Sequence, residues 1–412
     1  MAVELTHPPI PSGVRIESFS EGLPTLKAAS VTLREPRLSD APRLAEVLTT
    51  EEVTRFISAP PSNREGFEQF IAWIQQQRVS GQCFCYAIVP QGEEHAVGLI
   101  QFWLIEPEFG TVEWGFAIGH GYWGTGLFIA AARLALTFAF EHHGVHRVEA
   151  RASVENGRGI GVLKKLDFEF EGVVRSGLLA RDGTGDQSMW SLLAEDWTQR
   201  TECREITAQA SSPEIPYERR TSWLAGVWRD GVPPLVSSDV RLRELTASDI
   251  PRMLSLMNDD EVGRFIPRPP QSAQRFREFI DWTHRKRQTG SYLCFGIVPA
   301  AEQHAVGLFQ IRKLDPMFQI AEWGFALGRP YWGSGLFEES ARLVLRLLFE
   351  SVGLRRLEAR AAVANGRGNG ALRKMGATRE GQLRRSFLLN GQYCDDALWS
   401  IVTEDWHRSA VI

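Results

Sequence analysis

Two glycine-rich stretches have residue types and spacing suited to anion binding. Each lies between an expected strand and an expected amphipathic helix, where backbone N–H groups and the helix N-terminus favour negative charge. We predict that both hold a pyrophosphate group, although such a turn can also serve only to connect a strand to a helix through positive φ angles. The candidate residues are Trp123, Gly124, Thr125, Gly126, Leu127 and Phe128 in the first stretch, and Trp332, Gly333, Ser334, Gly335, Leu336 and Phe337 in the second.

The two stretches belong to an internal repeat. A shift of 209 residues aligns residues 22–197 with residues 231–406 without a gap. Each copy is long enough to form a hydrophobic core of its own. The 412-residue chain is therefore predicted to contain an N-terminal extension (1–21), a first domain (22–197), a linker (198–230) whose aromatic end packs on a domain, and a second domain (231–412).

Hydrophobic periodicity predicts the elements of the first copy, and the second copy follows it. Phe67, Phe70, Ile71 and Ile74 repeat at helical spacing. The expected helices begin at 39–42, cover 67–74, run from Leu127 to near Gly144 and cover 157–166, with a capping residue and Pro in the first turn of the first helix. The expected strands are 31–34, 84–89, 96–104, 110–118, 147–154, 168–172 and 188–193. This order, β-α-α-β-β-β-α-β-α-β-β, indicates an α/β fold with a mixed sheet.

The ordered set of motifs resembles the GNAT acyltransferase superfamily, and within it the RimJ/RimL-like branch of ribosomal-protein N-terminal acetyltransferases. The set comprises the glycine turn and its helix, the run His146-Arg147-Val148-Glu149-Ala150, then Asn156, then residues 162–168. The similarity covers residues 31–197 and 240–406.

This resemblance implies two tandem GNAT folds, each a mixed, mostly antiparallel, splayed sheet flanked by helices. It also implies that the glycine turns hold the pyrophosphate of coenzyme A, with acetyl-CoA or another acyl-CoA as the donor. The family often has Gln or Arg three residues before the first glycine, where this chain has Gly121 and Pro330. The absence of this Gln or Arg does not argue against the resemblance, because backbone N–H groups bind the pyrophosphate in this family.

Glu113 and Glu322 are the candidate general bases. Each lies on the strand that leads into a glycine turn, on the face opposite the large apolar residues. Transfer of an acyl group to an amine requires the neutral amine, so a carboxylate should take the proton directly or through water. Family members commonly place Glu on this strand, although a solvated glutamate on the polar face fits the same pattern.

Asn156 and Asn365 are candidate contacts for the pantetheine arm or for an ordered water, with a turn or N-cap role as the alternative. Arg158 and Arg367 follow in matching Asn-Gly-Arg-Gly runs. Each is predicted to reach the phosphates of the cofactor, with a solvated surface arginine as the alternative.

The general acid is not identified by the sequence. Many family members have Tyr at the positions of Leu163 and Leu372, and relatives in the RimJ/RimL branch usually have Ser at those of Gly159 and Gly368. Neither hydroxyl is present. Water, or a nearby Tyr, His or Cys, would then protonate the leaving thiolate; otherwise the copy is not catalytic.

Composition excludes several classes of function. A net charge of −4 gives no support for nucleic-acid binding, and no apolar run is long enough to cross a bilayer. The N-terminus lacks a basic start followed by an apolar core, so no secretory signal is expected. The five cysteines lack paired metal-ligand spacing, which indicates reduced thiols, no metal site and a cytoplasmic protein: Cys83, Cys85, Cys203, Cys294 and Cys394.

Two classes of function remain open. The first is an acyl-CoA-dependent N-acyltransferase that acetylates a primary amine, either on a peptide or protein N-terminus or on a small molecule such as an antibiotic or natural product. In one version a single copy catalyses while the other completes an intramolecular pseudo-dimer. The second is a ligand-sensing pair of acyl-CoA-binding domains without turnover. Intact glycine turns in both copies favour two working domains.

Overall fold

Two units make up the chain, one mainly before and one mainly after Arg219. The computed structural model describes residues 22–57, 60–106, 110–180, 183–198, 228, 231–266, 270–315, 317–389 and 391–409. The predicted N-terminal extension and nearly all of the predicted linker lie outside the described residues. Trp228, at the aromatic end of that linker, is buried in the hydrophobic core of the second unit.

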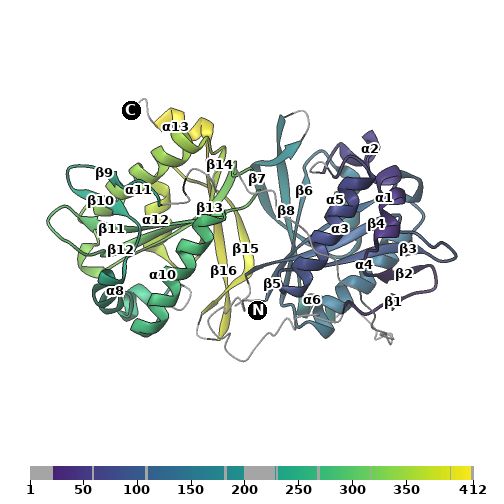
Figure 1. The fold of residues 1–412 in the computed structure, drawn as a ribbon, viewed down its shortest axis with the longest axis horizontal. Helices are drawn as coiled ribbons and strands as arrows, with labels where there is room; N and C mark the ends of the chain where they lie inside the picture. The colour runs from purple at the N-terminus through teal and green to yellow at the C-terminus, as the bar shows by residue number, and fades with distance from the viewer. Residues whose placement is uncertain are drawn as a thin grey trace. The chain divides into compact units, whose positions relative to one another are not determined.

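The first domain contains the expected elements in the expected order, together with three more (Figure 1). Its strands are β1 (Leu26–Lys27), β2 (Val31–Arg34), β3 (Cys83–Pro90), β4 (Gly98–Glu106), β5 (Thr111–Ile118), β6 (Arg147–Ser153), β7 (Glu169–Ala180) and β8 (Gly183–Leu193). Its helices are α1 (Ala41–Leu48), α2 (Glu51–Thr54), α3 (Arg64–Val79), α4 (Leu127–Thr137), α5 (Gly157–Lys165) and α6 (Ala194–Thr198). The three elements that the sequence prediction lacked are β1, α2 and α6. A π-helical segment, Phe138–His142, continues α4.

The second domain repeats this order (Figure 1). Its strands are β9 (Leu235–Val236), β10 (Val240–Arg243), β11 (Tyr292–Pro299), β12 (Gly307–Lys313), β13 (Ile320–Leu327), β14 (Arg356–Ala362), β15 (Thr378–Leu389) and β16 (Gln392–Val402). Its helices are α8 (Ile250–Met257), α9 (Asp260–Gly263), α10 (Ala273–Gln288), α11 (Leu336–Arg346), α12 (Gly366–Lys374) and α13 (Thr403–Ser409). The segment Leu347–Val352 continues α11 as a π-helix.

Each sheet is splayed at one place. The strand order in the first domain is β1-β2-β3-β4-β5-β6-β8-β7, and β5 and β6 form its parallel pair. They are paired only at Thr111–Trp114 with Arg147–Ala150, after which they part. In the second domain β13 and β14 pair in parallel only from Ile320 to Glu322. The structure confirms the splayed, mostly antiparallel sheet that the resemblance implied.

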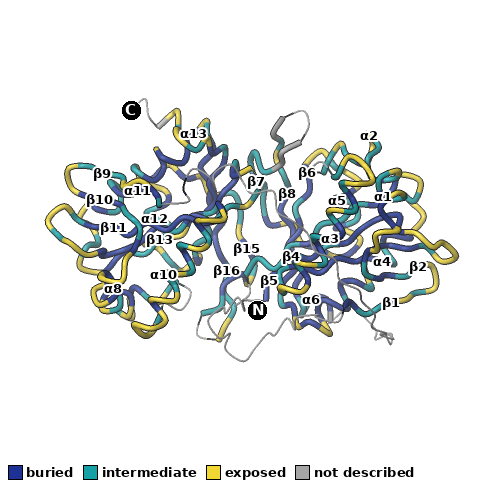
Figure 2. Tube along the Cα trace, viewed as in Figure 1, coloured by how far each residue is buried: buried dark blue, intermediate teal, exposed yellow. Residues whose placement is uncertain are grey.

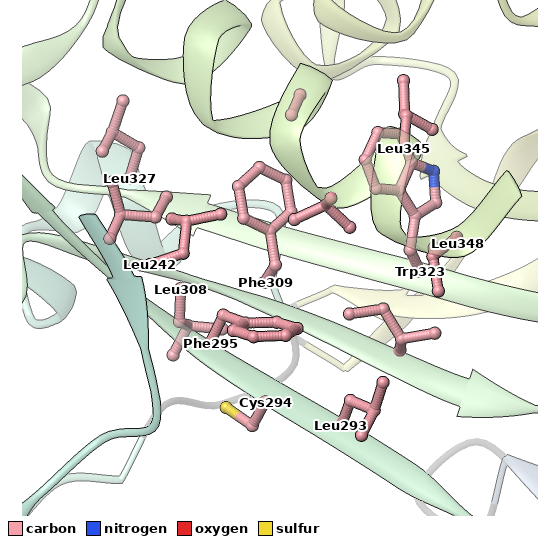
Figure 3. Close-up of a cluster of buried hydrophobic side chains, with 14 of the residues drawn as sticks. Leu242, Leu293, Cys294, Phe295, Leu308, Phe309, Trp323, Leu327, Leu345 and Leu348 are labelled. Carbon is pink, nitrogen blue, oxygen red and sulfur yellow. The ribbon is translucent and has the colours of Figure 1, made fainter. Parts of the chain in front are cut away.

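Helices cover both faces of each sheet. In the first domain α1 and α3 pack with alternate residues of β3 and β4 on one face, and α4 and α5 cover the other. The strands are buried while the outer helix faces are exposed (Figure 2). In the second domain Phe309 and Trp323 belong to the same buried cluster as Leu345 and Leu348, which lie on α11 and its π-helical continuation (Figure 3). These cores explain the period-two and helical patterns of the sequence.

An ion pair with a fully buried carboxylate ties the first helix of each domain to the sheet. Both oxygens of Asp40 accept from Arg34, at 2.7 and 2.8 Å, and they also accept the backbone N–H groups of Arg37 and Ala96. Helix α1 begins at Ala41 as expected, but the Asp40 side chain caps no helical N–H. That part of the sequence prediction is wrong, because the carboxylate instead links β2 to the turn before β4.

The second domain has the same pair in Arg243 and Asp249. Burial by itself would raise the pKa of the Asp249 carboxyl, but the hydrogen bonds from Arg243, Ala305 and Thr246 outweigh it and lower the pKa to about 2 from its ordinary 3.8. A carboxyl whose pKa is depressed by folding stabilises the fold above its unfolded pKa. That contribution is lost as the pH falls towards 2.

We therefore predict that Asp249→Asn lowers the free energy of unfolding by about 1–3 kcal/mol at pH 7, because it leaves the half-buried Arg243 guanidinium without its charged partner. Lowering the pH from 4 to 2 should destabilise the wild type more than this variant. Urea denaturation at a series of pH values measures both effects. Asp281→Asn, on the exposed face of α10, is the control; equal stability of the two variants would contradict the prediction.

Candidate functional site

The glycine turns have the backbone geometry that an anion cradle requires. Gly124 and Gly126 have φ angles of 76° and 84°, and Gly333 and Gly335 have φ angles of 74° and 85°. Such values are strained for residues with a Cβ atom. A Cβ atom at any of these four glycines would meet no atom within 4 Å, so the space above each turn is open. The glycines thus allow the positive φ angles of the turn between strand and helix, and they also leave room for a ligand.

Several backbone donors in the turn remain unused. Thr125 Oγ1 donates to Tyr122 O at 2.8 Å and accepts from Leu127 N at 3.3 Å, so the hydroxyl fixes the turn from within. Among the residues that the structure describes, the N–H groups of Gly124, Gly126 and Phe128 donate to no atom of the chain. Helix α4 begins at Leu127, which places these donors at its N-terminus.

The second domain repeats this arrangement. Ser334 Oγ donates to Tyr331 O at 2.7 Å and accepts from Leu336 N at 3.3 Å. In this part of the described chain, the N–H groups of Gly333, Gly335 and Phe337 also lack a chain acceptor. The side chains of Leu127, Phe128 and Leu336 are buried in their cores, so these residues can offer a ligand only their backbone.

A tryptophan and an arginine flank each cradle. The Trp123 indole N–H donates to Ile118 O at 3.0 Å, and the Arg158 guanidinium lies over the ring, 4.1 Å from its centroid. In the second domain Trp332 donates to Leu327 O at 2.7 Å, and Arg367 lies 4.0 Å from the ring centroid. A cation–π contact of this kind orients an exposed guanidinium. Each arginine is therefore held beside the residue that precedes the first glycine.

The tyrosine of each turn joins a network that sequence reasoning missed. Tyr122 Oη donates to the Glu93 carboxylate at 3.0 Å, and Arg43 donates to the same hydroxyl at 3.3 Å. The repeat of all three residues at Arg252, Glu302 and Tyr331 was the available signal, and those residues form the same contacts. The network anchors each cradle to the first helix and to the turn between two strands.

The candidate bases lie where the strands part. Glu113 is opposite Glu149 in the parallel register, one residue before the last pair, and Glu322 is opposite Glu358 in the last pair of its domain. On the same face, a Cβ atom at Gly115 would meet nothing within 4 Å. The same is true at Gly324 in the second domain, so each strand has open space between its glutamate and its cradle. Five residues of extended chain, about 17 Å, separate Glu113 from the end of β5.

Glu322 has two cationic neighbours. Arg312, which is directly opposite on β12, donates to Glu322 Oε2. The Arg360 Nε atom lies 3.7 Å from Glu322 Oε1. The Glu322 side chain is 15% exposed. The Glu322 carboxylate is therefore fixed by ion pairs at the point where β13 and β14 part, and it is not freely solvated.

Asn156 and Asn365 are N-caps of the next helix. Asn156 Oδ1 accepts from Gly159 N at 2.8 Å, and Asn365 Oδ1 accepts from Gly368 N at 2.9 Å. A Cβ atom at Gly159 would lie 2.7 Å from the Asn156 amide nitrogen. A side chain at this glycine would therefore require the capping amide to shift. The cap geometry supports the alternative weighed for these residues, and their predicted contact with a cofactor stays a prediction.

The other expected position of a general acid is also closed. Leu163 and Leu372 are each only 1% exposed and belong to the hydrophobic cores. His120 packs edge-on against the Trp123 ring, 4.8 Å between centroids, and its repeat position is Arg329. The general acid therefore stays unassigned.

A buried ionic network beside the splay is a second feature that sequence reasoning missed. Arg147 is fully buried and bonds to Glu149 on its own strand and to Glu171 on β7. Glu171 lies at a β-bulge, and its carboxylate also accepts from Ser191 on the strand between. The network repeats at Arg356, Glu358, Glu380 and Ser400. It braces the strand that diverges from the candidate base.

Two features are absent from the described residues. No helix in the described ranges is both long enough and apolar enough to span a membrane. Within the same ranges, no group of three or more His, Cys, Asp or Glu side chains is arranged to hold a metal ion.

Comparison with known proteins matches both copies. A family model described as Acetyltransferase (GNAT) domain matches residues 30–169 and residues 239–378. The chain is 28% identical over 174 residues to the uncharacterized N-acetyltransferase p20 of Bacillus licheniformis, covering 42% of this chain and 98% of that protein. It is 25% identical over 134 residues to the ribosomal protein uS5 alanine N-acetyltransferase of Escherichia coli, covering 32% and 69%. It is 27% identical over 154 residues to the spermidine N(1)-acetyltransferase of Escherichia coli, covering 37% and 81%.

The cap role makes a prediction for Asn156. Asn156→Ala should lower the free energy of unfolding by about 1 kcal/mol, because it removes the acceptor for Gly159 N. Asn156→Asp keeps an acceptor oxygen and places negative charge at a helix N-terminus, so it should retain the stability of the wild type. Urea denaturation compares the three proteins. If alanine proves as stable as asparagine, the cap is not what this residue contributes.

Proposed function

Because the chain belongs to the GNAT acetyltransferase family and contains two such domains in tandem, we propose that each domain binds acetyl-CoA and acetylates a primary amine. The observation that carries this proposal is the duplicated placement of an open glycine cradle and a carboxylate along one strand that parts from its neighbour. This arrangement suits a donor whose reactive thioester lies far from its phosphates.

The residues of the cradle fit the pyrophosphate of coenzyme A. The N–H groups of Gly124, Gly126 and Phe128 have no acceptor among the described residues and lie at the start of α4, where the helix dipole favours an anion. Arg158 adds a guanidinium beside them. In the second domain Gly333, Gly335, Phe337 and Arg367 have the same roles. The pantetheine arm would then follow the gap between the parted strands towards the glutamate.

Glu113 and Glu322 accept the proton of the incoming amine, directly or through a bound water. Acetyl-CoA supplies an acetyl group activated as a thioester. The amine nitrogen forms a bond to the acetyl carbon while the carbon–sulfur bond breaks. The thiolate is a good leaving group and takes its proton from water. General-base assistance of this kind contributes about 10²- to 10⁴-fold in rate.

We propose only the chemical class of the acceptor, which is a primary amine. Among the relatives, one is named for the alanine of a ribosomal protein and one for spermidine. A peptide or protein N-terminus and a small amine, including an antibiotic or natural product, are therefore the substrates to test first. The reaction would take place in the cytoplasm, where acetyl-CoA is available.

A second candidate is an acyl-CoA sensor without turnover. It is favoured by Gly159 and Leu163, and by their repeats Gly368 and Leu372, which offer no hydroxyl at the places where relatives carry one. Thiol release separates the two functions, because a sensor binds the thioester but does not cleave it.

The double variant Glu113→Gln/Glu322→Gln tests the catalytic proposal. It should lower kcat for thiol release by at least about 100-fold while acetyl-CoA still binds, because an amide cannot take the proton. The measurement is thiol release from acetyl-CoA with a panel of peptides and polyamines.

The matched control is Glu65→Gln/Glu278→Gln, which changes two exposed glutamates on α3 and α10. It should turn over at the rate of the wild type. Unchanged turnover by the first variant would remove both glutamates from the mechanism, and absence of thiol release by the wild type with every amine would favour the sensor.

A further inference from the structure

The two domains differ at the residue opposite the base. Trp103 on β4 is the cross-strand partner of Glu113, whereas Arg312 on β12 is the partner of Glu322. Three nearby pairs of residues are the same in both copies: Trp73 and Trp282, Gln101 and Gln310, and Arg151 and Arg360. The cross-strand partner of the exchanged residue differs as well, because Cys83 of the first copy is replaced by Tyr292 in the second.

The exchange is compensated on the neighbouring strand. In the first domain the Trp103 ring packs 5.2 Å from the Trp73 ring, and its indole N–H donates to Gln101 Oε1 at 3.2 Å. Its cross-strand neighbour on β3 is Cys83.

In the second domain the position of Cys83 is occupied by Tyr292. The Tyr292 ring packs 4.8 Å from the Trp282 ring, and its hydroxyl donates to Gln310 Oε1. Tyr292 thus replaces Trp103 in both contacts but reaches them from the next strand. Position 312 is thereby released from packing and can carry a charged side chain.

The released position brings a cation to the base. The Arg312 side chain is 35% exposed and its guanidinium pairs with Glu322, to which Arg360 is also close. One carboxylate therefore has two guanidinium groups around it in the second domain, whereas an uncharged indole occupies the place of Arg312 in the first. A guanidinium has five donors in a planar fork, and the 35% exposure of the Arg312 side chain lets an anion approach it from solvent.

We propose that the two domains acetylate different amines: the second takes acceptors with a carboxylate close to the amine, and the first takes acceptors without one. This inference rests on the proposed function, because it assigns the substrate class of the same two sites. Arg312 binds the carboxylate of the acceptor and sets the specificity of the second domain. The Trp103 surface offers the first domain an apolar contact in its place.

Variants that remove one of the two candidate general bases, called one-base variants below, allow the activity of each domain to be measured separately in the full chain. Glu113→Gln leaves the second domain active and Glu322→Gln leaves the first. The probes are the dipeptide amides Ala-Asp-NH₂ and Ala-Asn-NH₂, which are alike in size and differ by one charge. We expect Glu113→Gln to prefer the Asp peptide in kcat/KM by about tenfold, the value of one hydrogen bond to a charged group. Glu322→Gln should show no such preference.

Reciprocal exchanges supply the matched controls. Tyr292→Cys/Arg312→Trp, added to Glu113→Gln, should abolish the preference for the Asp peptide. Cys83→Tyr/Trp103→Arg, added to Glu322→Gln, should create it. Arg312→Gln is a milder change that should also abolish the preference if the double exchange disturbs folding. Calorimetric binding of both peptides in the presence of coenzyme A is a second readout that does not depend on turnover.

The outcomes separate the two proposals. If both one-base variants release thiol with the same ratio between the peptides, the inference is overturned while the proposed function stands. The inference is also overturned if the kcat/KM ratio between the Asp and Asn peptides is the same in Glu113→Gln with and without Arg312→Gln. If neither variant nor the wild type releases thiol with any amine, the proposed function fails, and the inference fails with it.

Discussion

The loss of hydrogen bonding between two parallel strands is the constraint on which the site depends. After Trp114 and Ala150, β5 keeps its pairs with β4 but no longer pairs with β6. A strand edge with unused backbone groups is a natural partner for an extended ligand. The buried Arg147 network holds the departing strand on one side, and the tryptophan of the turn ties the cradle to the end of β5 on the other.

Several parts of each domain serve this geometry. The Arg34–Asp40 pair fixes the first helix against the sheet, and Tyr122 joins that helix to the glycine turn. The Asn156 side chain caps α5 through the N–H of Gly159 and lies close to that glycine. The chain thus has several buried or half-buried polar contacts that determine where its backbone donors point, and the same contacts recur in the second copy.

Much of this could be predicted from sequence. Periodicity located the helices and strands, and the repeat located both glycine turns. Local patterns could not reveal contacts that depend on which strands become neighbours. Glu171 reaches Arg147 across an intervening strand from a β-bulge, and Tyr292 replaces Trp103 from the adjacent strand. Asp40 was recognised at a helix start, but its partners lie on β2 and before β4.

The central claim is that both cradles are working coenzyme A sites. Calorimetric titration of the full chain with coenzyme A tests it most directly, because the claim predicts two sites per chain. Gly335→Val should reduce the count to one, since a branched side chain at a φ of 85° distorts the second cradle while the first is untouched. A single site in the wild type, or two sites that persist unchanged in Gly335→Val, would contradict the account.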